Sequence, residues 1–222
     1  MAILWILAAL AFAYLLGSVS FAVIFSKAFA NKDVRDFGSG SAGMTNVIRA
    51  IGILPGILTF VCDALKGFVV CFAAKNLFFQ NAFEISGEWW ANPIYGMYLC
   101  GVICMLGHMF PVFFGFKGGK GVATSVGIFA VCCPIAIALG LAVFVLCVAI
   151  SKIVSLSSLI ATVMVVTGVV IWHSTEAAAL PQIILGVLMG VLVFYKHKEN
   201  ISRLIKGEEK RLVARKGEKK NG

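Results

Sequence analysis

The fold of this chain is decided by residues 107–127, GHMFPVFFGFKGGKGVATSVG. An apolar run that begins near Ile94 leads into two lysines and four glycines, and a second apolar run resumes at Val122. A lysine at the centre of a bilayer costs about 2.5–3.5 kcal/mol, so Lys117 and Lys120 are expected at an interface or in a wet cavity. Glycines are poor in helix interiors, but they let backbone N–H groups close around an anion. The stretch predicts a phosphate-binding loop at membrane level.

Two segments resemble nucleotide-binding motifs in residue pattern but lack the features that these motifs require. The segment GFKGGKG at 115–121 lacks the spacing of a Walker A loop and the Ser or Thr that must follow its lysine. The segment GSGSAG at 38–43 fits GxGxxG, but it follows an expected membrane span and no parallel strand. Neither segment predicts a nucleotide site.

The composition indicates an integral membrane protein. Of 222 residues, 60% are hydrophobic and 13% are charged, and the mean hydropathy is +0.98. This chain is too apolar for an ordinary soluble domain, and it is long enough for about six to eight spans. The seven cysteines all lie in apolar runs without a CxxC pair, so we expect neither a metal site nor a disulfide framework.

The distribution of charge predicts the orientation in the membrane. Residues 196–222 carry ten Lys or Arg and four Glu, whereas 80–92 and 173–180 carry three Glu and no Lys or Arg. The positive-inside rule places the basic tail in the cytoplasm and the two acidic segments outside. The N-terminus is then external, and the first apolar run is read as a span because no basic residues precede it.

The apolar runs predict an all-α, polytopic membrane domain of seven transmembrane helices with glycine-rich loops on the cytoplasmic side. Between Lys120, inside, and His173, outside, the chain must cross an odd number of times, and three crossings fit the length. The run 122–133 spans only about 18 Å against a core of about 30 Å, so it is tilted, half-broken or continues past Pro134. The predicted spans are 2–25, 51–79, 94–114, 122–133, 134–150, 155–172 and 180–195, followed by the tail 196–222.

Asp63, Lys66 and His108 are ionisable residues inside the predicted spans. Asp63 and Lys66 are spaced i,i+3, so they share a helix face and can neutralise each other, either as a structural pair or in catalysis. His108 is expected to be a packed histidine bonded to a carbonyl group. The glycine- and hydroxyl-rich segment 33–49 is either a binding segment or a polar turn in which residues 39–46 cap the next helix, and capping leaves Arg49 unexplained.

Three separated segments resemble motifs of the bacterial acyl-phosphate:glycerol-3-phosphate acyltransferase family, the PlsY type. Residues 107–124 match its second motif almost residue for residue, and 38–52, GSGSAGMTNVIRAIG, and 197–204, HKENISRL, look like its first and third. The first motif departs from the family at Ser41, where Asn is usual, and at Met44, where Ala is usual. Ser155 matches the catalytic-region serine of the family best, and Ser158 is the alternative.

The resemblance implies a seven-span enzyme of the bacterial inner membrane. Such an enzyme moves a fatty acyl group from acyl phosphate to the 1-hydroxyl of sn-glycerol 3-phosphate, in the first acylation of phospholipid synthesis. Lysophosphatidic acid and phosphate are the products, and no metal, nucleotide or other cofactor is needed. The expected partners are the two substrates and membrane lipids, with no nucleic acid, and a monomer is favoured.

The predicted site combines an anion clamp with one proton acceptor. Arg49 and Lys120 suit the clamp, together with glycine amides. His197 suits the base because its ordinary pKa is about 6.5, with a phosphate oxygen of the substrate as the rival acceptor. The predicted catalytic residues are His197, Lys120, Ser155 and Asn200. The predicted substrate- or phosphate-binding residues are Ser39, Gly40, Gly43, Thr45, Asn46, Arg49, Lys117, Gly118, Gly119 and Gly121.

Two other classes of membrane protein compete with this hypothesis. A transporter of phosphate or a phosphorylated solute would need similar cationic loops, but its charges should lie near the bilayer midplane, often within inverted repeats. The sequence shows no such repeat. A structural subunit with a lipid-binding tail would explain the basic C-terminus, but it would leave Arg49, Lys120 and His197 without a role.

Overall fold

All regular structure in the described residues is helical, which confirms the predicted all-α class. The computed structural model describes residues 1–176 and 179–212. The α-helices are α1 (Ala2–Gly17), α2 (Phe21–Ala30), α3 (Met44–Ala50), α4 (Ile53–Ala73), α5 (Phe79–Ser86), α6 (Pro93–Met109), α7 (Val122–Cys132), α8 (Pro134–Ser151), α9 (Val154–His173), α10 (Leu180–Lys196) and α11 (Lys198–Ile205). Shorter helical turns are η1 (Val34–Asp36), η2 (Ala74–Phe78), η3 (Trp89–Ala91) and η4 (Val112–Phe114).

The protein is a multi-pass integral membrane protein. Within the described ranges, five segments are long and apolar enough to cross a membrane, or six when α10 and α11, bent by 60°, count as one span. Helix α7 has only 11 residues, as the short apolar run indicated. The five segments are Ala2–Ala30, Ile53–Ser86, Pro93–Phe114, Pro134–Ser151 and Val154–His173.

The helices α7 to α10 cover nearly the same residues as the corresponding predicted spans, with ends that agree to within one residue. The first predicted span differs. The helical run is broken between α1 and α2, at residues 18–20, and α2 then continues to Ala30. The second predicted span is also longer than expected, because the π-helical turn η2 joins α4 to α5 without ending the helix.

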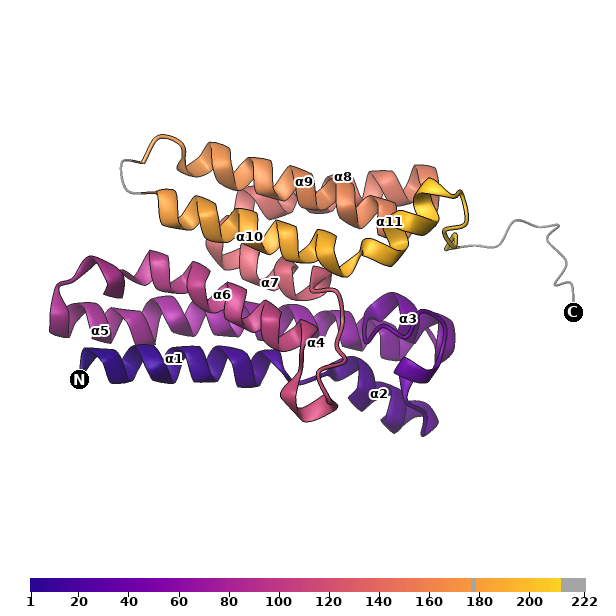
Figure 1. Cartoon of the computed structure of the whole chain (residues 1–222), viewed down its shortest axis with the longest axis horizontal. Helices are drawn as coiled ribbons and strands as arrows, with labels where there is room; N and C mark the ends of the chain where they lie inside the picture. The colour runs from indigo at the N-terminus through magenta and orange to yellow at the C-terminus, as the bar shows by residue number, and fades with distance from the viewer. Residues whose placement is uncertain (177–178, 213–222) are drawn as a thin grey trace, which may run out of the picture.

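The long helices form two groups with α7 between them (Figure 1). Helices α1, α4, α5 and α6 lie together, and α8, α9 and α10 form the other group. Helix α7 packs against α4 on one side and also contacts α6 and α8. Many apolar side chains point outward, such as Val145 and Ile150 of α8, which are 64% and 76% exposed. An outward apolar surface of this kind is suited to lipid.

Small residues allow the helices to approach closely. A Cβ atom on Gly17 of α1 would collide with the backbone of Cys104 in α6. In α10, Gly186 and Gly190 form a small-xxx-small face that packs against valine side chains of α9. Van der Waals packing of this type holds helices together where no hydrophobic effect acts between them.

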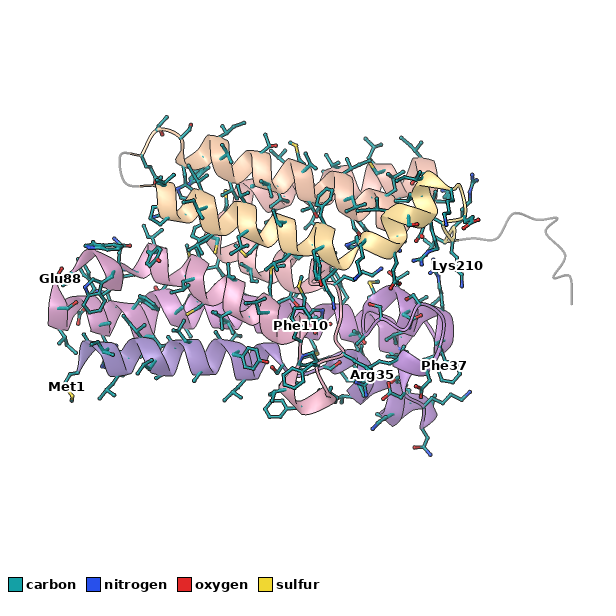
Figure 2. All side chains as sticks on the ribbon, viewed as in Figure 1. Met1, Arg35, Phe37, Glu88, Phe110 and Lys210 are labelled. Carbon is teal, nitrogen blue, oxygen red and sulfur yellow. The ribbon has the colours of Figure 1, made fainter. Side chains whose placement is uncertain are left out.

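The two ends of the bundle carry different segments. Figure 2 shows Met1 and Glu88 at one end, and Arg35, Phe37 and Lys210 at the other. The glycine-rich loop before α3, helix α11 and the tail segment 207–212 therefore meet at the same end of the molecule.

Candidate active site

A cavity of about 590 Å³ lies where these segments meet. Its walls come from the first glycine-rich loop (residues 37–43) and α3, from α4 and α6, and from the start of α7. Helices α8 and α9, and α11 with the tail segment, complete the walls. The predicted site residues that line it are Ser39, Gly43, Thr45, Asn46, Arg49, Lys120, Gly121, Ser155, His197 and Asn200. The remaining four, Gly40, Lys117, Gly118 and Gly119, are not among its lining residues.

Asn46 holds the first glycine-rich loop in shape. Its amide nitrogen donates to the carbonyl groups of Val34, Phe37 and Ser41 at 2.9–3.1 Å. Its amide oxygen accepts from the backbone N–H of Ser39 at 3.1 Å. Both ends of the side chain are therefore used within the loop.

Arg49 stands in the last turn of α3, exposed and facing the cavity. Its guanidinium donates to the carbonyl oxygen of Lys210 at 3.4 Å, a long contact from α3 to the tail segment. Among the described residues it forms no ion pair with a carboxylate. Most of its five donors thus remain available to an anion.

The second glycine-rich loop (residues 115–121) packs against His108. The backbone N–H of Gly119 donates to the carbonyl of His108 at 3.1 Å, and Cβ atoms on Gly118 or Gly119 would collide with this residue. These two glycines therefore serve close packing in the structure, and the Gly119 amide is already used. Gly121 has a φ of +84°, which turns the chain into α7, whereas Lys117 is exposed outside the cavity.

Lys120 is the cation that this loop presents to the cavity. Its ammonium group donates a hydrogen bond to the side-chain oxygen of Asn200. Burial lowers the pKa of Lys120 to about 8, although the charge of Glu209 acts in the opposite direction. The lysine is thus mainly protonated at neutral pH, and it loses its charge within the range in which enzymes are assayed.

Glu209, in the tail segment, is a site residue that the sequence analysis missed. Its carboxylate accepts hydrogen bonds from Ser155 at 2.9 Å, from Asn200 at 2.7 Å and from Arg203 at 2.8 Å. Burial raises the pKa of Glu209, but these hydrogen bonds outweigh burial and lower the pKa overall. No sequence pattern separated Glu209 from the other acidic residues of the basic tail.

His197 lies at the junction of α10 and α11, buried beside the cavity. Its Nδ1 is 2.8 Å from the carbonyl oxygen of Val193, and a carbonyl oxygen can only accept, so Nδ1 carries the proton. The other ring nitrogen, Nε2, is left as an acceptor. Burial and the charge of Lys120 lower the pKa of His197 to about 4, well below the ordinary value assumed from the sequence.

Asp63, Lys66 and His108 form a buried cluster of ionisable side chains beside the cavity. The ammonium of Lys66 lies 2.8 Å from the carboxylate of Asp63, as the i,i+3 spacing predicted, and both side chains are buried. It also lies 3.0 Å from Nδ1 of His108, so this ring bonds to the ion pair and not to the carbonyl group expected from the sequence. Asp63 and His108 line the cavity, although neither was predicted as a site residue.

The fold and the cavity together define a class: a polytopic helical membrane protein with a cationic, partly apolar site at one end. A family model described as glycerol-3-phosphate acyltransferase matches residues 7–207. Glycerol-3-phosphate acyltransferase 2 of Bacillus anthracis is 38% identical over 90% of this chain and 95% of its own length. The enzyme of Thiobacillus denitrificans is 40% identical over 91% and 95%.

Two solved structures have the same fold. They are crystal structures of PlsY (YgiH), an integral membrane glycerol 3-phosphate acyltransferase, in a glycerol 3-phosphate form and a lysophosphatidic acid form. Their TM-scores are 0.78 and 0.75 at 35% and 34% identity, each covering 93% of this chain and 94% of the solved chain. This chain belongs to the glycerol-3-phosphate acyltransferase family. The predicted family and enzyme class are confirmed, and the transporter and structural-subunit hypotheses are set aside.

Proposed function

We propose that this acyltransferase uses acyl phosphate as its donor and the 1-hydroxyl of sn-glycerol 3-phosphate as its acceptor. Lysophosphatidic acid and inorganic phosphate would leave, in the first acylation of phospholipid synthesis. The observation that carries the proposal is the convergence of Arg49, Lys120 and His197 from three separate segments on one cavity. The forms named for the solved relatives are an acceptor and a product of this reaction.

The cationic side chains supply the clamp for two phosphate groups. Arg49 offers a fork of donors that suits a phosphate, and Lys120 offers a point charge. Part of the cavity wall is apolar, with Phe144 and Val148 of α8 and Val154 of α9. A substrate with a phosphate head and a fatty chain would satisfy both parts of such a cavity.

The transfer needs no covalent enzyme intermediate, because acyl phosphate is already an activated mixed anhydride. The acceptor oxygen attacks the carbonyl carbon, the bond from that carbon to the phosphate oxygen breaks, and phosphate leaves with the electron pair. The protein contributes positioning and charge stabilisation. Lys120 would stabilise the negative charge on the leaving phosphate, and Ser155 would position substrate without acting as a nucleophile.

The proton of the attacking hydroxyl has two available acceptors. His197 presents a free Nε2, and an anionic substrate bound beside the ring would raise its pKa from the low value of the empty site. A phosphate oxygen of the substrate is the rival acceptor. A His197→Gln variant separates the two: lost turnover with intact substrate binding supports the histidine, and retained turnover with weaker binding excludes it.

We further propose the topology that the charge distribution predicted. The chain would cross the bacterial inner membrane seven times, with α7 and α10 as the shorter crossings, and the protein would work as a monomer without a cofactor. The cavity would then open to the cytoplasm, where the polar substrate is dissolved. The basic residues of α11 and the tail segment, at the cavity end of the bundle, support this orientation. Residues 213–222 of the predicted tail lie outside the described residues.

The test is an assay of the purified protein with acyl phosphate and labelled glycerol 3-phosphate. Labelled lysophosphatidic acid should form, and Lys120→Ala in folded protein should abolish its formation. Parallel reactions with acyl thioesters test the choice of donor. If the thioesters support turnover and acyl phosphate does not, the proposed donor is wrong.

A further inference from the structure

The tail segment 207–212 forms part of the cavity wall through Glu209, Lys210 and Leu212. It leaves α11 through a turn at Gly207, which has a φ of +72°. The backbone N–H of Leu212 donates to the carbonyl of Lys152, between α8 and α9, at 2.7 Å. Within this short segment Glu209 points inward, with a side chain only 7% exposed, whereas the neighbouring Glu208 is exposed.

Glu209 determines how the amide of Asn200 is oriented. The carboxylate accepts from Nδ2 of Asn200 at 2.7 Å, and Lys120 donates to Oδ1 of the same amide. A carboxylate cannot donate and an ammonium cannot accept, so only one orientation of the amide satisfies both neighbours. The three side chains form a chain of hydrogen bonds from the tail segment to the loop before α7.

Glu209 also determines which hydrogen bonds the Ser155 hydroxyl can make to a substrate. The hydroxyl proton of Ser155 is donated to the carboxylate at 2.9 Å. The hydroxyl oxygen keeps its lone pairs, so toward the cavity it can only accept. A serine held in this way suits a substrate hydroxyl group and does not suit a phosphate oxygen.

We propose that Glu209 is a positioning residue of the acyl transfer reaction: it orients Asn200 and Ser155 toward the substrate and holds the tail segment in the wall of the cavity. The inference rests on the proposed function, because the groups it positions are those assigned to substrate binding. Arg203 holds the other carboxylate oxygen at 2.8 Å, so the carboxylate is fixed from both sides.

The negative charge of Glu209 has a second effect, which can be measured. It raises the pKa of Lys120 against burial, which lowers that pKa to about 8. Removal of this charge therefore moves the pKa of Lys120 further down, and the lysine loses its proton at a lower pH. The other ionisable groups that act on Lys120 or line its cavity are Arg49, Asp63, His108, His197, Glu199, Arg203 and Lys210. The substitution below leaves all of them in place.

The experiment compares Glu209→Gln with Glu208→Gln. Both substitutions remove one negative charge from the tail segment, but Glu208 is exposed and is not among the residues that line the cavity. The measured quantities are kcat and KM for glycerol 3-phosphate as a function of pH, in purified protein whose wild type has first been shown to be active. An inactive wild type refutes the proposed function; the comparison with the variants is what tests the role of Glu209.

For Glu209→Gln, kcat is expected to fall about tenfold. The fall of kcat/KM at alkaline pH, called the alkaline limb, is expected to shift by about one pH unit to lower pH. Glu208→Gln should match the wild type, and Glu209→Asp should restore the position of the limb. If Glu209→Gln fails to fold, Glu209→Asp is used in its place, because it keeps the negative charge on a shorter side chain. Glu209→Asp is expected to keep the wild-type alkaline limb but to have a reduced kcat. A wild-type kcat in Glu209→Asp would refute the inference. An unchanged pH profile of kcat/KM in Glu209→Gln would overturn the proposed role of Glu209. A higher kcat in Glu209→Gln would also overturn it, because it would indicate that the carboxylate competes with substrate phosphate.

Discussion

The rate of acyl transfer is expected to fall above about pH 8, because the site loses the cation of Lys120 there. Burial lowers the pKa of this lysine to about 8. With that pKa, about nine tenths of the free enzyme carries the cation at pH 7 and about one tenth at pH 9. Since kcat/KM reports the ionisation of the free enzyme, it should fall by about tenfold for each pH unit above the pKa.

A Lys120→Arg variant provides the control. An arginine stays protonated throughout the range, so the alkaline fall should disappear even if the absolute rate is lower. The assay is the initial rate of labelled lysophosphatidic acid formation from about pH 6.5 to about pH 9.5, with the spontaneous hydrolysis of acyl phosphate measured separately at each pH. A constant kcat/KM in the wild type would refute the reasoning, as would an equal fall in the arginine variant.

Three further predictions concern binding, stability and topology. Arg49→Lys should raise the KM for glycerol 3-phosphate by about tenfold with little change in kcat, since a point charge replaces a forked contact; unchanged kinetics would count against the clamp. Lys66→Met should lower the free energy of unfolding by about 3–5 kcal/mol, because it leaves the buried carboxylate of Asp63 uncompensated, and the double variant with Asp63→Asn should regain much of it. Cysteines introduced at Ser86 and Lys210 of a cysteine-free variant should be labelled from opposite sides of the membrane, and labelling from one side would exclude the proposed topology.

The sequence predicted the helices well because their lengths follow from the bilayer. Apolar runs of about 20 residues cannot form anything but helices in lipid, so their ends are readable from composition. The break between α1 and α2 was missed for a physical reason. The residues at the break, Ser18, Val19 and Ser20, are small or apolar and interrupt no hydropathy pattern.

The candidate site was predicted where a motif fixes both residue type and local spacing. Lys120, His197 and Asn200 come from such motifs, and the structure places all three at one cavity. Glu209 was not found, because its position depends on how the tail folds back onto the loop between α8 and α9. The backbone hydrogen bond from Leu212 to Lys152 contributes to that contact, and no side-chain pattern records it.

The glycines show a different limit of sequence reasoning. A cluster of glycines predicts either an anion cradle or close packing, and both need the same absence of a side chain. In the structure, Gly118 and Gly119 pack against His108, and the Gly119 amide is used by the carbonyl of that residue. Only the tertiary contact with α6 distinguishes the two roles.

Direct transfer from acyl phosphate to the acceptor within one cavity can be tested by following the release of phosphate. Purified enzyme is mixed rapidly with acyl phosphate alone, and glycerol 3-phosphate is added later while phosphate and lysophosphatidic acid are both measured. If transfer is direct, no burst of phosphate precedes the addition of the acceptor, and afterwards one phosphate is released for each molecule of product acylated at the 1-hydroxyl. A burst equal to the enzyme concentration would reveal an acyl-enzyme and rule out direct transfer.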